Sequence, residues 1–282
     1  MFDSITIIGV GLISGSFSLA LKDRGLVRNV IGVSRTAASA EKALKLGIID
    51  EVLPLEEAVR KSDLIYVAIP VDVTVPVMRQ IMDLVTERQI VADAGSTKKV
   101  LCESLADHPM RRRMVATHPM WGTEYSGPEA AVHNAFAGRA CVICEKEKSA
   151  PDALATMEDI YKQLGMNLVY MDADSHDMHA AYISHISHIT SFALANTVLE
   201  KEREESTIFD LAGGGFESTV RLAKSNPSMW LPIFMQNREH VLDVLNEHIA
   251  QLRKFKSCLE KENYTYLQEL MESANKIRRI LK

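Results

Sequence analysis

Two patterns of hydrophobic residues alternate along the first part of the chain. Residues 5–8, 30–33 and 64–70 are short, nearly continuous apolar runs, as expected of parallel strands buried on both faces of a sheet. Residues 38–46 and 73–85 place apolar side chains at helical spacing, which predicts helices. This alternation of strand and helix is typical of a doubly wound parallel sheet with helices on both faces.

The β pattern stops at residue 171. Further strands are predicted at residues 89–93, 114–117, 140–144 and 166–171, and only helices and turns follow. The chain is therefore expected to consist of an α/β domain, residues 1–171, and an all-α domain for substrate binding and dimerisation, residues 172–282.

Prolines and capping residues indicate where the expected helices begin and end. Pro76 is compatible only with the first turn of the helix at 73–85. In the second half the predicted features are a helix capped by Asp174 or Ser175 and running to about Lys201, a break at 211–216, a helix at 219–224 that Asn226-Pro227 stops, and a long amphipathic helix through Val241, Leu245, Leu252, Phe255 and Leu259. The last of these indicates a helix for packing or dimerisation, and a homodimer through the helical domain is expected.

A glycine-rich turn joins the first strand to the first helix. Gly9 permits the tight turn, Gly11 lets backbone N–H groups approach a pyrophosphate, and Ser14 is small enough for close packing of helix and strand. The helix N-terminus adds partial positive charge. These features predict a Rossmann-type dinucleotide site in which Gly9, Gly11, Leu12 and Ile13 contact the cofactor.

The end of the second strand bears on the choice of cofactor. An acidic residue there would hold the ribose of NAD, but the chain has Ser34 and Arg35, and Arg35 suits a 2′-phosphate. This favours NADP or the use of both cofactors; alternatively, Arg35 stacks on adenine and serves either. Ile69 and Pro70 complete the predicted cofactor-binding residues.

Two polar segments, residues 93–98 and 118–124, follow predicted strands. Ligands bind at the carboxyl ends of such strands, so Ser96 and His118 are expected to face the nicotinamide. A structural role for His118 is the alternative.

Composition narrows the function classes. A net charge of −5 gives no sign of nucleic-acid binding, and Arg111 to Arg113 are interpreted as a solvated edge. No apolar run has membrane-spanning length and no signal peptide is evident, so a cytoplasmic protein without a membrane partner is expected. Cys141 and Cys144 lie on a predicted strand with their side chains on opposite faces, which argues against a redox pair.

The helical half holds further candidates. His185 and His188 share a helix face, but without a matched third ligand they do not predict a metal site. Arg221 lies between the apolar residues Val220 and Leu222, which indicates a partly buried guanidinium suited to a carboxylate ligand.

Four segments together resemble one family. HPMWGTE from His118 to Glu124, with Ser126-Gly127, is similar to H-P-[MI]-A-G-T-E-x-S-G, and residues 93–98, 184–188 and 213–230 resemble further family segments. The family is that of the prephenate/arogenate dehydrogenases of tyrosine biosynthesis, and the likeness covers nearly the whole chain. The departures from its pattern are Trp121, Ser187, Ser218 and Val220.

The resemblance implies an NAD(P)-dependent oxidative decarboxylation of prephenate to 4-hydroxyphenylpyruvate. In that reaction His118 acts as general base or polariser, and Ser96 bonds His118 or the substrate hydroxyl. Arg221 clamps a substrate carboxylate and His188, supported by His185, contacts the pyruvyl side chain. The remaining residues implied to bind substrate are Thr123, Glu124 and Trp230, the last of them from either side of a dimer interface.

Three alternatives remain open. Arogenate dehydrogenase applies the same chemistry to an amino-acid side chain. A β-hydroxyacid-type dehydrogenase would rely on a helical-domain lysine such as Lys224. A catalytically silent NAD(P)-sensing protein is favoured if His118, Ser96 and Arg221 do not converge in space.

Overall fold

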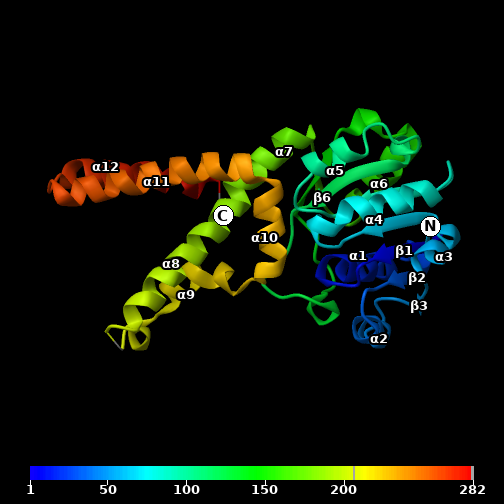
Figure 1. Cartoon of the computed structure of the whole chain (residues 1–282), viewed down its shortest axis with the longest axis horizontal. Coiled ribbons are helices and arrows are strands. Elements are labelled where there is room, and N and C mark those ends of the chain that lie inside the picture. The colour runs from blue at the N-terminus through cyan, green and yellow to red at the C-terminus, as the bar shows by residue number, and fades with distance from the viewer. Residues whose placement is uncertain (206, 281–282) are drawn as a thin grey trace. The chain divides into compact units, whose positions relative to one another are not determined.

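The computed structural model describes residues 1–205 and 207–280. The chain divides into two compact units, Met1–Asn237 and Arg238–Lys282. The first unit contains the sheet (Figure 1). All the predicted site residues also fall within its range.

One mixed sheet organises the first unit, in the strand order β3-β2-β1-β4-β5-β6-β7-β8. All neighbouring strands are parallel except β6 and β7, which are antiparallel. This confirms the predicted doubly wound sheet and adds two reversed strands, β7 and β8, at one edge. The strands are β1 (Phe2–Ile8), β2 (Val27–Val33), β3 (Glu51–Val52), β4 (Leu64–Val67), β5 (Ile90–Asp93), β6 (Met114–Pro119), β7 (Ala140–Cys144) and β8 (Asn167–Met171).

Helices cover both faces of the sheet. One face packs against α1 (Leu12–Asp23), α2 (Ala37–Lys45) and α6 (Pro151–Gln163), and the other against α3 (Leu55–Lys61), α4 (Val71–Leu84) and α5 (Lys99–Ser104). On the first face the ring of Phe17 stacks on Tyr66, with ring centroids 4.0 Å apart. Short 3₁₀ turns lie at Arg111–Arg113, Pro128–Ala130 and Lys146–Lys148.

The cysteines of β7 point to opposite faces, as predicted. Cys141 packs in the core on the α1 face and Cys144 in the core on the α4 face. Both are free thiols, and burial raises the pKa of each well above its usual value. A thiol held protonated is a poor nucleophile, so the two do not form a redox pair.

Two local predictions are wrong. Helix α4 begins at Val71, so Pro76 lies in its second turn, where the carbonyl of Asp72 loses its usual donor. The arginine run is not a solvated edge, because Arg111 and Arg113 are 5% and 3% exposed. Arg113 Nη1 contacts both carboxylate oxygens of Asp152, at 2.9 and 2.8 Å.

Helices continue after β8. They are α7 (Ala173–Ala180), a π-helical turn (Ala181–His185), α8 (Ile186–Glu202), α9 (Gly214–Val220) and α10 (Pro227–Gln236), with 3₁₀ turns at Phe209–Leu211 and Arg221–Lys224. β8 ends at Met171, where the β pattern was expected to end. The division into domains at residue 171 stays a prediction.

The helix boundaries in this region differ from expectation. Asp172, not Asp174 or Ser175, caps α7, because its side chain accepts from the Ser175 N–H. The single helix predicted to run to Lys201 is interrupted by the π-helical turn. α9 already begins within the predicted break, at Gly214.

Asn226-Pro227 starts a helix that the sequence analysis missed. Asn226 caps α10 and Pro227 occupies its first turn, where a missing N–H costs nothing. Trp230 and Ile233 of this helix pack with Val71 of α4.

The second unit contains α11 (Arg238–Glu260), α12 (Tyr264–Ala274) and a 3₁₀ turn (Asn275–Arg279). The long helix predicted through Val241 and Leu259 is confirmed as α11. In neither unit is a described helix long and apolar enough to cross a membrane.

Candidate active site

The glycine turn lies between β1 and α1 and is held by one side chain. Gly9 has φ +85°, and a Cβ there would come within 2.6 Å of the Ala68 carbonyl oxygen, so only glycine fits. The Ser14 hydroxyl accepts from the Gly11 N–H at 3.1 Å and donates to the Gly9 carbonyl. Ser14 therefore braces the turn, which a third glycine could not do.

The surroundings of this turn fit a dinucleotide. Nothing lies within 4 Å of where a Gly11 Cβ would be, so the N-terminus of α1 faces open space. Leu12 and Ile13 form the first turn of α1, and the Ile69 side chain lies against Gly9. β1 and β4 are neighbours at the point where the strand order reverses, the usual place for a bound nucleotide.

The loop after β2 is near the surface. The Ser34 hydroxyl donates to the Thr36 carbonyl at 3.1 Å, and Thr36 in turn caps α2. Arg35 is exposed and forms no ion pair with any other described residue. Pro70, on the neighbouring β4 side, is the N-cap of α4.

A buried ion pair supports the loop after β5. Asp93 and Lys98 are both fully buried, and the Lys98 ammonium contacts Asp93 Oδ2. Asp93 also accepts from the backbone N–H of Gly95 at 2.9 Å and of Thr117 at 3.1 Å. The carboxylate thus fixes its own loop and the end of β6 in one position.

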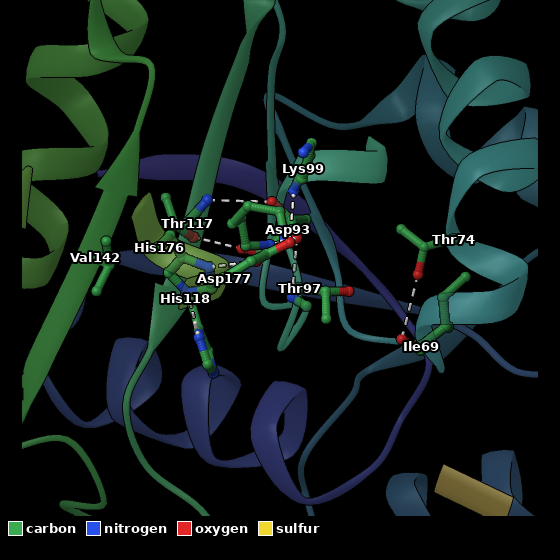
Figure 2. A network of polar contacts seen from close by, with 12 residues as sticks. Ile69, Thr74, Asp93, Thr97, Lys99, Thr117, His118, Val142, His176 and Asp177 are labelled. Atoms are coloured by element: carbon green, nitrogen blue, oxygen red, sulfur yellow. Dashed lines mark hydrogen bonds and ion pairs between the residues drawn. The ribbon is translucent and has the colours of Figure 1, made fainter. Parts of the chain in front are cut away.

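His118 heads a chain of hydrogen bonds (Figure 2). It lies on β6, and its Nδ1 is 2.8 Å from Nε2 of His176. His176 Nδ1 is 2.7 Å from Asp177 Oδ1. Asp177 accepts from the backbone N–H of Lys98 at 2.7 Å and of Lys99 at 3.0 Å.

This surrounding keeps His118 neutral. Burial lowers its pKa well below the usual 6.5, and the neighbouring His176, Lys98 and His185 lower it further. A neutral imidazole can accept a proton from a substrate hydroxyl.

Turnover is accordingly expected to persist below pH 6.5. Because its pKa is lowered, His118 stays unprotonated as the pH falls through 6.5, and activity is lost only at lower pH. The pH profile of kcat/KM tests this expectation. An acidic midpoint at or above 6.5 would contradict it.

Ser96 follows β5 and is partly exposed. Among the described residues it makes no hydrogen bond to His118, whose Nδ1 is taken by His176. The predicted Ser96–His118 bond is therefore not formed, and a bond from Ser96 to the substrate hydroxyl stays a prediction.

Two predicted substrate residues contact each other. Arg221 Nη1 is 2.7 Å from Glu124 Oε2, across 97 positions of sequence. The Arg221 side chain is half-exposed. Thr123 lies beside Glu124 in the loop after β6, where its hydroxyl accepts from the Tyr125 N–H at 3.3 Å.

An aromatic cluster adjoins this pair. The ring of His188 stacks on Trp230 with centroids 3.4 Å apart, and the ring of His185 meets Trp230 edge-on at 5.9 Å. Both histidines thus face Trp230 of their own chain. Burial lowers the pKa of His188, and the charge of Arg221 lowers it further, which places Arg221 near this cluster.

The sequence analysis missed the residues behind His118. His176 and Asp177 adjoin it only through folding, 58 and 59 positions along the chain. Asn237 was missed as well; it donates to the Asp177 carbonyl at 2.6 Å and contacts His185 Nδ1 at 3.1 Å. No spacing motif marks these residues.

Two of the four residues that depart from the family pattern, Trp121 and Ser218, make defined local contacts. Trp121 meets the ring of Phe136 edge-on at 5.7 Å, so the larger side chain fills space against the core. The Ser218 hydroxyl donates to the Gly215 carbonyl within α9. In the described part of the chain, no three His, Cys, Asp or Glu side chains gather as metal ligands.

These features define a class of protein. The sheet has a braced glycine turn after β1, at its strand-order switch, and a neutral histidine on β6, three strands further along the same edge. This combination is that of a dinucleotide-dependent oxidoreductase.

Comparisons with known proteins agree. Residues 17–170 match the family model "Prephenate dehydrogenase, nucleotide-binding domain", and residues 172–273 match "Prephenate dehydrogenase, dimerization domain". The chain therefore belongs to the prephenate dehydrogenase family.

Individual relatives extend over most of the chain. Prephenate dehydrogenase of Bacillus subtilis is 29% identical over 99% of this chain and 76% of its own length. Cyclohexadienyl dehydrogenase of Zymomonas mobilis is 29% identical over 100% and 97%. The crystal structure of Aquifex aeolicus prephenate dehydrogenase with hydroxyphenyl propionate and NAD⁺ aligns with a TM-score of 0.92 at 28% identity, over 100% and 99%.

Proposed function

We propose that the protein is a prephenate dehydrogenase, which oxidatively decarboxylates prephenate to 4-hydroxyphenylpyruvate with NAD(P)⁺. The observation that carries the proposal is the neutral, hydrogen-bonded His118 at the strand edge that also bears the glycine turn. Family membership supports the choice of substrate. A purely nucleotide-sensing protein has no need of a neutral base in this position.

The chemistry requires positioning and the handling of one proton. A nicotinamide held at the glycine turn would supply the acceptor for the hydride of the hydroxyl-bearing ring carbon. His118 takes the hydroxyl proton as the carbon–oxygen bond gains double-bond character. The bond to the ring carboxylate then breaks, its electron pair completes the aromatic ring, and CO₂ leaves. The oxygen recovers a proton, so the overall reaction releases none.

Arg221 is the proposed clamp for a substrate carboxylate. Its guanidinium is already aligned by Glu124, and a substrate carboxylate has to share it or displace that partner. We expect Arg221→Ala to raise the KM for prephenate roughly 10- to 100-fold, the worth of one or two charged hydrogen bonds. Initial rates measure this.

Lys224→Ala is the matched control, since Lys224 is a neighbouring cation in the same 3₁₀ turn. Its KM is expected to stay within about twofold of the wild type. An unchanged KM in Arg221→Ala would mean that the carboxylate is held elsewhere. A lost kcat in Lys224→Ala would instead favour a lysine-dependent dehydrogenase.

One observation favours arogenate as a second candidate substrate. His188 Nδ1 is 3.1 Å from the Ser184 carbonyl, which can only accept, so Nδ1 carries the proton and Nε2 is an acceptor. The ammonium of arogenate offers a donor to Nε2, whereas the keto group of prephenate offers none. The ratio of kcat/KM for the two substrates decides between them.

The preference between NAD and NADP is tested at Arg35. An exposed guanidinium that forms no ion pair within the described part of the chain is available to a 2′-phosphate, and this favours NADP or dual use. We expect Arg35→Ala to lower kcat/KM for NADP about tenfold and to leave NAD within about twofold. Equal losses for both cofactors would instead indicate stacking of Arg35 on adenine.

A cytoplasmic homodimer completes the proposal. The match of residues 172–273 to a dimerization domain supports the dimer, as do exposed apolar side chains of the second unit such as Leu252, Leu259 and Ile277. The four cysteines are free and buried, as in proteins of a reducing compartment.

A further inference from the structure

Two side chains behind His118 have no part in the mechanism above. His176 and Asp177 begin the helical half of the chain, on α7, and are 2% and 1% exposed. Too deep to touch substrate, they still reach His118 through an unbroken line of hydrogen bonds (Figure 2).

Asp177 is the fixed end of this line. Both carboxylate oxygens accept backbone N–H groups, Oδ1 from Lys98 at 2.7 Å and Oδ2 from Lys99 at 3.0 Å. Its own carbonyl accepts from Asn237 at 2.6 Å. A carboxylate held in this way is an acceptor only and cannot turn away from its neighbours.

The acceptor at one end sets the proton positions along the line. Since Asp177 can only accept, Nδ1 of His176 carries a proton and donates to Oδ1. A neutral His176 then has a lone pair on Nε2, which accepts from Nδ1–H of His118. The remaining lone pair of His118 is on Nε2, and that nitrogen is the proton acceptor.

These proton positions require the imidazoles of His118 and His176 both to be neutral. Burial lowers the pKa of His176 as it does that of His118, and Lys98 lowers both. The other charged or titratable groups facing the line are Asp93, which pairs with Lys98, and His185. Burial lowers the pKa of His185 to about 4, so it too is neutral near pH 7.

We propose that His176 and Asp177 are positioning residues that fix the tautomer and ring orientation of His118, so that Nε2 is always the atom presented to the substrate hydroxyl. The proposal rests on the proposed function for the role of His118 as base. The hydrogen bond to His118 that the resemblance had implied for Ser96 is thereby assigned to His176.

The test removes the acceptor and then restores it. His176→Leu leaves His118 Nδ1 without a partner, and kcat is expected to fall roughly 10- to 100-fold while the KM for prephenate changes less than about threefold. His176→Gln restores a side-chain acceptor and is expected to recover most of that loss. His179→Leu, at an exposed histidine of the same helix, is the matched control and should behave as the wild type.

A nitrogen NMR spectrum of ¹⁵N-histidine-labelled protein gives a readout independent of turnover. The His118 signals, identified by their absence in His118→Ala, are expected to show a protonated Nδ1 and a bare Nε2 in the wild type. In His176→Leu the two tautomers should mix.

Two results would overturn the positioning role of His176 and Asp177. One is a wild-type His118 protonated on Nε2, and the other is a folded His176→Leu variant with unchanged kcat. If the wild type oxidises neither prephenate nor arogenate, the proposed function is wrong. The NMR spectrum still tests whether His176 fixes the tautomer of His118.

Discussion

Replacement of His118 by alanine is expected to lower kcat at least about 10²-fold, the usual contribution of a positioned general base. The side chain is partly exposed at the end of β6, and burial together with its neighbours keeps it neutral. Alanine removes the proton acceptor without touching the glycine turn, so the affinity for NAD(P)⁺ should change less than about threefold. Steady-state rates and cofactor titration measure the two quantities.

His179→Ala provides the control for substitution of a histidine in this unit. His179 is exposed, and among the described residues it bonds only the Ser175 carbonyl. Thermal unfolding of both variants shows whether the fold is retained. If folded His118→Ala keeps wild-type kcat, His118 is not the base and the mechanism given above is wrong.

The second large effect is on stability, at Asp93. Asp93→Ala leaves the fully buried ammonium of Lys98 without its counter-charge and removes the acceptor for two backbone N–H groups. Breaking one side of a buried ion pair costs about 3 to 5 kcal/mol, so the free energy of unfolding should fall by about that amount. Denaturant titration measures it.

The double variant Asp93→Asn/Lys98→Met separates charge from packing. It removes both charges, keeps a polar acceptor near the backbone N–H groups and approximates the volume of the lysine. Its loss is expected to be well under half that of Asp93→Ala. A loss below 1 kcal/mol in Asp93→Ala would mean that Lys98 finds water or another partner there.

Much of the nucleotide-binding half follows from local patterns. Alternating apolar runs predicted the strands, and the glycines at 9 and 11 predicted the turn, because tight turns and close backbone approaches leave few alternatives to glycine. The opposite orientation of Cys141 and Cys144 followed from the two-residue period of a strand.

The site beyond the strand ends depends on distant contacts. His118 and Arg221 were identified by their surroundings in sequence and by resemblance, but their partners His176 and Glu124 are 58 and 97 positions away. Nothing local specifies such pairs. The burial of Arg113 was missed for the same reason, since Asp152, its partner, lies 39 positions further on.

The predicted helix boundaries in the second half of the chain were wrong for a different reason. Asn226-Pro227 both ends one helix and begins the next, but only the end of the first helix was predicted from it. The π-helical turn at Ala181–His185 has no signature in composition. It coincides with tertiary contacts of His185 to Trp230 and Asn237, which local sequence does not reveal.

The central claim is that this chain oxidises and decarboxylates prephenate. The direct test is the stoichiometry of reduced cofactor and CO₂ formed from a known amount of prephenate, with NAD⁺ and NADP⁺ in parallel. We expect one reduced cofactor and one CO₂ per prephenate, at a rate abolished or nearly so in His118→Ala. Cofactor binding without formation of either product, from prephenate or from arogenate, would contradict it and favour a nucleotide-sensing protein.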